Sequence, residues 1–404
     1  MRVAVVGGGP AGVISAIELA KNGNEVFILE KNSRILKKLL ATGNGRCNYT
    51  NVSVTADNYN CKNNFVEECL KLFTKDDLID YFKMMGVEPV VENRGKIFPV
   101  TLKSNTVVNT LLNELEDNNV NVITDEEVIN IKKKGRFLLT TKNSKYESDI
   151  VIFAAGGSSM PSSGSDGKSY KVLENLGHTK IDTFPALTQL TLKSDYLKSL
   201  SGVKVVGTVK LLDGKKVIEK RNGDLLFTNY GISGPPILDI SRKVNEKNRN
   251  LKIEMPLINN IEDTEKFREI LYSRYYTLSY FSLERWLMGI IDKKFVPMVL
   301  REINIPRETP MNMIEEYKFE ILLNILLKST FEVTGTKGFE NSQVTCGGIS
   351  TEEINKKTME SKIVKGLYIV GEVMDVDGDC GGYNLQWAFS SGINAARSII
   401  CKTN

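Results

Sequence analysis

The sequence predicts an α/β protein: a Rossmann dinucleotide-binding domain with an inserted domain of β-barrel plus helices. Three observations predict this fold. The chain opens with a strand, a glycine turn, a helix and a second strand. A second glycine-rich segment precedes the last helix, and between the two the pattern changes near residue 186 to short alternating strands and helices. We expect the dinucleotide-binding domain over residues 1–186 and 336–404, and the inserted domain over 187–335.

The first βαβ unit occupies residues 2–30. An apolar run over 2–6 predicts a strand, residues 10–22 predict a helix that stops at Gly23, and residues 25–30 predict the next strand. Glu30 ends this strand, where a carboxylate would accept hydrogen bonds from ribose hydroxyls. An acid there disfavours a ribose phosphate, so FAD or NAD fits better than NADP.

The glycine turn of this unit reads Gly7-Gly8-Gly9-Pro10-Ala11-Gly12. Gly7 would make the tight turn, Gly9 would let the backbone approach a pyrophosphate, and Gly12 would let the helix pack closely on the strand. The amides of the first helical turn and the helix dipole would face the phosphates. The turn therefore predicts a dinucleotide site.

The rest of the first domain is less distinctive. Residues 65–85 and 105–118 predict helices, and 121–123, 128–131, 136–141 and 148–155 predict strands. The last strand runs into Gly156-Gly157, which would be a second point of close backbone approach. In the inserted domain, residues 203–211 and 216–220 predict a hairpin, 224–228 and 251–257 predict strands, and 262–291 and 311–327 are expected to be helical.

The chain ends on another glycine-rich turn. Residues 366–370 predict a strand that runs into Gly371-Glu372, and residues 381–384 lead into a final helix over 385–400. Two glycine-rich ends so far apart in sequence make sense if they hold opposite ends of one long ligand, and FAD is long enough. The final helix would stabilise charge on a reduced flavin ring. Because no second GxGxxG unit follows residue 40, any nicotinamide donor must bind transiently, or another donor serves.

Composition excludes several other classes. With 404 residues, 41% hydrophobic and 25% charged, the chain is typical of a soluble two-domain protein. Its apolar runs are too short to span a membrane, and the first strand starts at residue 2, so we expect no targeting segment and a cytoplasmic location. The net charge of +4 is carried by scattered clusters, which favours solvated faces over a nucleic-acid footprint.

The metal-binding residue types are sparse. The six cysteines form no CxxC pair and His178 is the one histidine, so we expect no metal site. His178 follows a helix end and is expected to be structural rather than chemical.

A longer motif carries a family resemblance. Residues 38–51, Lys38-Leu39-Leu40-Ala41-Thr42-Gly43-Asn44-Gly45-Arg46-Cys47-Asn48-Tyr49-Thr50-Asn51, together with blocks at 95–99, 156–178, 226–235 and 347–386, resemble two-domain flavoproteins. That family includes bile-acid enone reductases and ribosomal-RNA dihydrouridine synthases. Cys346 and Cys380 depart from the pattern, and we expect them to be packing substitutions.

The resemblance implies a glutathione-reductase-like FAD domain, tightly bound FAD and NAD(P)H as a transient donor. Most members with an assigned activity reduce a conjugated C=C, although an amine oxidase has also been ascribed to the family. Hydride would go to the carbon β to a carbonyl and an acid would protonate the α carbon. A steroid enone and the uracil ring both present that arrangement.

The resemblance also implies site residues. Cys47 is the candidate proton donor, and the alternative is that it packs beside the loop while water supplies the proton. Arg46 is a candidate for neutralising charge on the flavin, or else a structural anchor of the loop. The expected cofactor-binding residues are Gly7, Gly9, Pro10, Ala11, Gly12, Glu30, Lys31, Lys38, Thr42, Gly43, Asn44, Gly45, Arg46, Ala155, Gly156, Gly157, Gly371, Glu372, Asp375, Gly382, Tyr383, Asn384 and Leu385.

We therefore expect an FAD-dependent oxidoreductase that reduces an activated double bond between its two domains. The modest positive charge favours uracil in RNA, with possible contact to ribosomal RNA, over a small enone. An amine oxidase that passes electrons to oxygen, and a non-enzymatic flavin-stabilised RNA-binding module, remain open. A basic face on the inserted domain would indicate RNA, and a narrow apolar cleft would indicate a small enone.

Overall fold

The computed structural model describes residues 1–244, 250–261 and 263–403, which form two compact units. Unit 1 comprises Met1–Pro185 and Phe339–Asn404, and unit 2 comprises Ala186–Gly338. The boundaries expected from the sequence, after residues 186 and 335, differ from these by a few residues. The predicted α/β class with an inserted β-domain is confirmed.

Unit 1 is built on a five-stranded parallel sheet in the order β20-β11-β1-β2-β7. The strands are β1 Arg2–Val6, β2 Glu25–Leu29, β7 Asn121–Ile123, β11 Ile150–Phe153 and β20 Leu367–Ile369. β1, β11 and β20 are almost wholly apolar and buried, as expected for parallel strands that are covered on both faces. All five carboxyl ends lie at one edge, where Rossmann folds bind their ligands.

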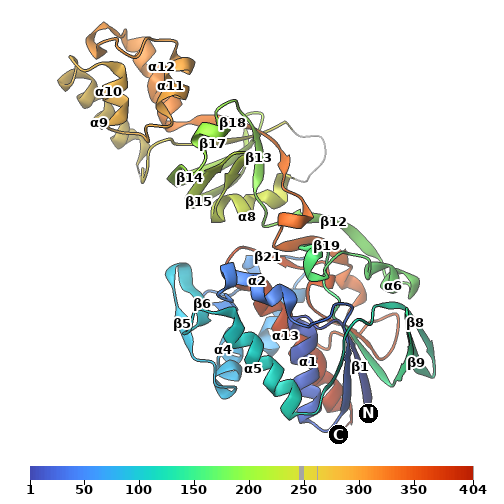
Figure 1. Ribbon diagram of the computed structural model, residues 1–404. Helices are drawn as coiled ribbons and strands as arrows, with labels where there is room; N and C mark the ends of the chain where they lie inside the picture. Colours follow the sequence, from blue (N-terminus) through green and yellow to red (C-terminus); the bar gives the residue numbers. More distant parts are fainter. Residues whose placement is uncertain (245–249, 262, 404) are drawn as a thin grey trace. The chain divides into compact units, whose positions relative to one another are not determined.

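Two helices from opposite ends of the chain pack side by side in this unit (Figure 1). They are α1, Pro10–Lys21, and α13, Tyr383–Thr403. The Ser15 hydroxyl donates to the Gly392 carbonyl at 3.0 Å, and a Cβ on Gly392 would come within 2.5 Å of the Ala11 carbonyl oxygen. The N- and C-terminal segments thus share one core.

The remaining helices of unit 1 are α2 Lys37–Gly45, α3 Phe65–Leu72, α4 Lys75–Met84, α5 Ser104–Asp117 and α6 Tyr170–Asn175. The single helix expected over residues 65–85 is wrong, because Thr74 starts a new one. The Thr74 hydroxyl accepts from the Asp77 amide, and the Asp77 carboxylate accepts from the Thr74 amide. This reciprocal cap ends one helix and begins the next.

Small antiparallel sheets complete unit 1. β3 Thr50–Asn51, β6 Lys96–Pro99 and β5 Pro89–Val91 form one, and β10 Lys145–Ser148, β9 Arg136–Thr141 and β8 Val128–Lys134 form another. β12 Lys180–Ala186 pairs with β19 Val344–Ile349, and β21 Asp377–Gly378 pairs with β4 Tyr59–Asn60.

Unit 2 contains a closed barrel in the order β13-β16-β15-β14-β17-β18. Its strands are β13 Leu190–Lys193, β14 Lys204–Asp213, β15 Lys216–Thr228, β16 Gly231–Ser233, β17 Leu251–Met255 and β18 Ser329–Thr336. The predicted break between 216–220 and 224–228 is wrong, because β15 stays paired to β14 across residues 221–223. Gly223, with φ 147°, lies opposite Gly207 and lets the strand continue where the sequence suggested a turn.

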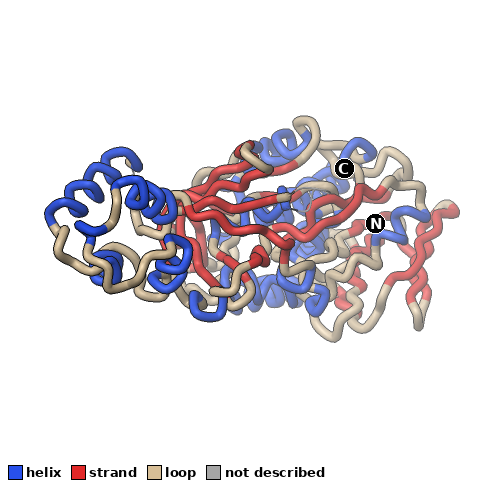
Figure 2. The backbone as a smooth tube through the Cα atoms, turned by 90° about the horizontal axis from the view of Figure 1, so that it is seen from above, coloured by secondary structure: helices blue, strands red, loops and turns tan. Residues whose placement is uncertain are grey.

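Helices complete unit 2, with α9–α12 gathered beyond the strands of its barrel (Figure 2). They are α7 Leu197–Leu200, α8 Pro235–Val244, α9 Thr264–Thr277, α10 Leu283–Met288, α11 Val296–Ile303 and α12 Glu316–Leu327. The helix expected over 262–291 is two helices, and its residue 262 lies outside the described residues. The sequence reading missed α8 and α11. No described helix is long and apolar enough to cross a membrane.

Candidate cofactor and active site

The first glycine turn needs Gly7 and Gly12 for two different steric reasons. Gly7 has φ 104°, and a Cβ on it would come within 2.5 Å of the Ala154 carbonyl oxygen. A Cβ on Gly12 would come within 2.2 Å of the Gly7 oxygen, whereas one on Gly9 would meet nothing within 4 Å. Close packing therefore occupies both ends of the turn, and the middle is open to an approaching ligand.

Glu30 lies against this turn. The Gly8 amide donates to Glu30 Oε2 at 2.8 Å, and the Asn32 amide donates to Oε1 at 2.8 Å. Gly8 is also required by space, because its Cβ would come within 2.3 Å of Ile35 Cγ2. The prediction from the sequence gave Gly8 no role. The carboxylate is thereby fixed at the end of β2, 8% exposed.

The family-signature segment forms a tight turn at the end of α2. Thr42, Gly43 and Asn44 have non-helical backbone angles, and Gly43, Asn44 and Cys47 have positive φ of 58°, 57° and 61°. A Cβ on Gly43 would come within 2.8 Å of the Asn48 amide nitrogen. The positive φ and this close approach explain why glycines dominate the segment.

Arg46 anchors this turn to a neighbouring hairpin. Its Nη1 donates to Glu92 Oε2 at 2.8 Å, and its guanidinium lies 4.5 Å from the centre of the Phe98 ring. These contacts correspond to the anchoring role that the sequence left open.

Cys47 is fully buried, with 0% of its surface exposed. Burial raises the pKa of its thiol to about 12, although Thr42 lowers it in part by hydrogen bonding. Proton transfer is most efficient when the donor pKa lies near the working pH. The position and acidity of Cys47 therefore favour the alternative in which the thiol packs beside the loop and water supplies the proton.

The signature segment lies against the C-terminal glycine turn, more than 300 residues away in sequence. Asn51 Nδ2 donates to the carbonyls of Gly381 at 3.0 Å and Arg94 at 3.1 Å. A Cβ on Gly382, where φ is 99°, would come within 2.4 Å of the Thr50 oxygen. The structure therefore brings residues 42–51 and 381–384 together.

The predicted residues Tyr383, Asn384 and Leu385 form the first turn of α13. Asn384 pairs with the Gly378 backbone in both directions, accepting from the amide and donating to the carbonyl at 2.8 Å each. The Tyr383 carbonyl accepts from the Tyr59 hydroxyl at 2.8 Å. These contacts position the turn that precedes the helix.

A third group of predicted residues gathers at the carboxyl ends of β11 and β20. Lys38 Nζ lies 2.5 Å from Glu372 Oε2, while Glu372 Oε1 accepts from the Thr345 amide at 2.9 Å. A Cβ on Gly157 would lie 3.2 Å from Glu372 Oε1. Near the first turn, Ala155 Cα would come within 2.8 Å of a Cβ on Gly7.

Two further predicted residues lie in charged surroundings. Lys31 Nζ forms an ion pair with Asp166 at 2.7 Å. The charges of Glu372 and Asp375 add to burial in raising the pKa of Tyr170, whose hydroxyl is buried. Asp375 therefore lies in the same electrostatic environment as Glu372.

The residues of the candidate site fit a dinucleotide, because they leave polar groups that its hydroxyls and phosphates could satisfy. Asn48 Oδ1 and Ser165 Oγ are buried without a hydrogen-bond partner in the described part of the chain. Asn48 Oδ1 lies 2.9 Å from the position of a Cβ on Gly382, and Ser165 Oγ lies 3.1 Å from one on Gly156. At α1, the N-cap residue Gly9 has no side chain to satisfy the first-turn amides, which suits a phosphate.

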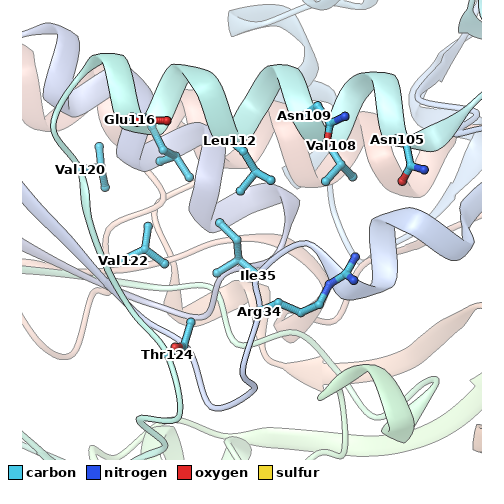
Figure 3. A pocket seen from close by; sticks show the side chains of 11 residues that line it. Arg34, Ile35, Asn105, Val108, Asn109, Leu112, Glu116, Val120, Val122 and Thr124 are labelled. Atoms are coloured by element: carbon cyan, nitrogen blue, oxygen red, sulfur yellow. The ribbon is translucent and has the colours of Figure 1, made fainter.

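A groove of about 590 Å³ lies between α5, β7 and the segment after β2. Figure 3 shows Ile35, Leu112 and Val122 around it, with Arg34 and Glu116 also in its lining. Its lining contains none of the residues predicted from the sequence.

His178 is buried and lies in a network with Glu353 and Ser361. Its Nδ1 lies 3.2 Å from Glu353 Oε2 and its Nε2 lies 2.9 Å from Ser361 Oγ. Ser361 Oγ also accepts from the amides of Ile363 and Val364, so the hydroxyl is held by its own turn. Among the described residues, no group of His, Cys, Asp or Glu side chains could hold a metal ion.

Known proteins resemble the chain over its whole length. The family model for the HI0933-like protein Rossmann domain matches residues 1–398. A 3-dehydro-bile acid delta(4,6)-reductase of Clostridium scindens is 33% identical over 98% of this chain and 98% of its own. A ribosomal RNA dihydrouridine synthase of Haemophilus influenzae is 32% identical over 98% of this chain and 97% of its own.

Among solved structures, a 3-ketosteroid delta1-dehydrogenase of Sterolibacterium denitrificans has a TM-score of 0.51 at 12% identity, over 99% of both chains. This likeness confirms the fold alone. The full-length family match and the two relatives establish the rest: this chain belongs to the HI0933-like family of Rossmann-fold, FAD-binding flavin oxidoreductases.

Proposed function

We propose that this flavin oxidoreductase holds FAD tightly, takes electrons from a transiently bound NAD(P)H and reduces the C5=C6 bond of uracil in ribosomal RNA. The observation that carries the cofactor assignment is the meeting of the two ends of the chain. The Cβ of Ala11, in the first turn of α1, lies 2.9 Å from the position of a Cβ on Gly371 after β20. A ligand bound at the first turn of α1 can therefore also contact the segment after β20.

Each group of residues has a role in this proposal. The first-turn amides of α1 bind the pyrophosphate, and Glu30 binds the ribose. Lys38, Glu372 and the first turn of α13 orient the rest of the cofactor. When bound, FAD supplies hydride chemistry to a carbon β to a carbonyl. Water then protonates the α carbon, because the Cys47 thiol is buried and weakly acidic.

Charge on unit 2 supports an RNA substrate. Residues 186–338 contain 24 Lys and Arg against 19 Asp and Glu, whereas the rest of the chain contains 29 against 30. Lys216 and Lys220 on β15 and Lys252 on β17 are exposed. β14 lies between these two strands, and its Lys210 lies opposite Lys220 and pairs with Glu254 at 2.7 Å. Such a basic face is what binding to RNA phosphates requires. The relative at 32% identity is named as a ribosomal RNA dihydrouridine synthase.

Small-enone reduction is the second candidate, because the relative at 33% identity is named as a bile-acid reductase. Mass mapping of dihydrouridine in ribosomal RNA from a deletion strain separates the two. Loss of a dihydrouridine that returns on complementation supports the RNA substrate, and unchanged dihydrouridine rules it out.

Anaerobic reoxidation of the NAD(P)H-reduced protein by a 3-oxo-Δ4 steroid would then support the enone. Peroxide formed from an amine without NAD(P)H would indicate an amine oxidase.

A further inference from the structure

We propose that Thr345 is a positioning residue of the cofactor site, whose hydroxyl holds the loop of residues 156–160 in place beside Glu372. The inference rests on the proposed FAD site and assigns a role to a residue that touches the predicted cofactor-binding residues. Thr345 lies on β19, in the segment by which the chain re-enters unit 1 after residue 338.

The Thr345 side chain is fully buried and makes three hydrogen-bonding contacts. Its Oγ1 accepts from the amide of Ser158 at 2.7 Å and from the amide of Ser159 at 3.0 Å. It also lies 3.1 Å from Ser159 Oγ. Two consecutive amides, the Ser158 amide part-buried and the Ser159 amide buried, therefore depend on one hydroxyl oxygen. A buried amide left unpaired there would be costly.

The same hydroxyl explains why residue 157 is a glycine. A Cβ on Gly157 would come within 2.4 Å of Thr345 Oγ1 and 2.7 Å of Thr345 Cβ. Gly157 does not have a positive φ, so space rather than backbone conformation requires it. The sequence reading assigned this glycine to close approach of a ligand, whereas the structure fills the space with Thr345.

The backbone of Thr345 reaches a second part of the site. Its amide donates to Glu372 Oε1 at 2.9 Å, and Glu372 Oε2 pairs with Lys38. One residue thus connects the loop after β11, the turn after β20 and the start of α2. All three carry residues that the sequence predicts to bind the cofactor.

The contacts continue along the same segment toward unit 2. Ser342 Oγ lies 2.7 Å from Ser159 Oγ, and the Met160 amide donates to the Phe339 carbonyl at 2.9 Å. Residues 339–345 therefore run along residues 158–160 as a strap. We infer that the strap sets the loop geometry and that Thr345 contributes most, because its hydroxyl alone satisfies two amides.

The test compares variants of the full-length protein, freed of flavin and titrated with FAD. Thr345→Val keeps the shape but removes the acceptor, so the FAD dissociation constant should rise at least about tenfold and the flavin absorbance band should shift. Thr345→Ser keeps the hydroxyl and should restore binding to within about threefold of the unmodified protein.

Thr141→Val is the matched control. The Thr141 hydroxyl accepts from two nearby amides, of Asn143 at 3.3 Å and Ser144 at 2.9 Å, but it lies at the β9–β10 turn. This variant should bind FAD normally. If Thr345 had a merely structural role, folded Thr345→Val and folded Thr141→Val would bind FAD with the same affinity.

The inference is overturned if Thr345→Val binds FAD with unchanged affinity and spectrum, or if Thr345→Ser is as impaired as Thr345→Val. Should Thr345→Val not fold, Ser342→Ala provides the test, with an expected rise of about threefold in the FAD dissociation constant; an unchanged value would refute it. Failure of the unmodified protein to bind FAD would instead remove the proposed function.

Discussion

Ala11 packs directly against Gly371, with its Cβ 2.9 Å from the position that a Cβ would take on Gly371. Ala11 is the second residue of α1 and Gly371 follows β20, so this contact joins the N-terminal and C-terminal parts of unit 1. Gly371 has φ 77°, and its amide donates to Ser391 Oγ at 3.0 Å. Both the space and the backbone angle require glycine.

Gly371→Ala should therefore destabilise the protein and weaken FAD binding. Gly23→Ala is its control, because Gly23 has φ 78° but open space around a Cβ. The strain of a positive φ costs about 1–2 kcal/mol in each variant. Overlap with Ala11 should lower the unfolding free energy of Gly371→Ala by about 1–3 kcal/mol more. Urea unfolding of both variants measures this difference. If both variants lost the same unfolding free energy, the close approach of Ala11 would not be what requires glycine at residue 371.

Asn51→Ala should loosen the join between the signature segment and the C-terminal turn. Its buried amide group donates to the Arg94 and Gly381 carbonyls, so both would lose their donor. The expected loss is about 1–3 kcal/mol of unfolding free energy, with weaker FAD binding. Asn22→Ala, at an exposed hydrogen bond to the Glu18 carbonyl, should change stability by less than about 0.5 kcal/mol. If Asn51→Ala lost stability but kept its FAD affinity, Asn51 would have no role in shaping the cofactor site.

Stability should fall as the pH is lowered through the titration of His178. Burial lowers the pKa of this histidine below 6.5, and outweighs the opposing effect of Glu353. The unfolded chain therefore takes up the proton first, so the stabilisation is complete above about pH 6.5 and is lost below it, by at most about 1.4 kcal/mol per pH unit. Urea unfolding at pH 7.5 and 5.5 measures this. His178→Gln should reduce the difference, and an identical pH dependence would contradict the assignment.

Cys47 should resist alkylation in the folded protein. Because burial raises the pKa of its thiol to about 12 and leaves it unexposed, little reactive thiolate exists at pH 8. Cys401, which is exposed, provides the internal control. Peptide mass mapping after iodoacetamide should find Cys401 modified and Cys47 intact until the protein unfolds.

The same burial predicts that Cys47→Ala reoxidises reduced flavin at nearly the normal rate with substrate. Stopped-flow absorbance of the reduced flavin measures that rate. A drop of tenfold or more, with unchanged FAD affinity, would restore Cys47 as the proton donor.

Neutralising the barrel lysines should weaken RNA binding through charge alone. Lys216, Lys220 and Lys252 are exposed, and each contact with a phosphate adds about 0.7–0.9 to the slope of log affinity against log salt. Lys216→Gln, Lys220→Gln and Lys252→Gln together should lower both the affinity for a ribosomal RNA fragment and this slope. Lys71→Gln, on α3 of unit 1, is the control, and an equal effect there would argue against the barrel as the RNA-binding face.

The sequence predicted well where local pattern determines local structure. The order strand, glycine turn, helix and acid places Gly7, Gly9, Gly12 and Glu30 within one βαβ unit, where each is near the next in the chain. It failed where pairing partners decide. β15 is continuous because β14 pairs with it across residues 221–223, and Gly8 is required because Ile35 fills the adjacent space.

The α/β class, the barrel in the inserted domain and the segments of the candidate site could thus be predicted from the amino-acid pattern alone. These depend on hydrophobic period and on glycine, which act over a few residues. Only the tertiary structure placed residues 42–51 against 381–384, buried Cys47, engaged Arg46 with Glu92 and put Thr345 in the space beside Gly157. Such contacts join residues far apart in the chain, and they depend on how whole elements pack, which no local pattern encodes.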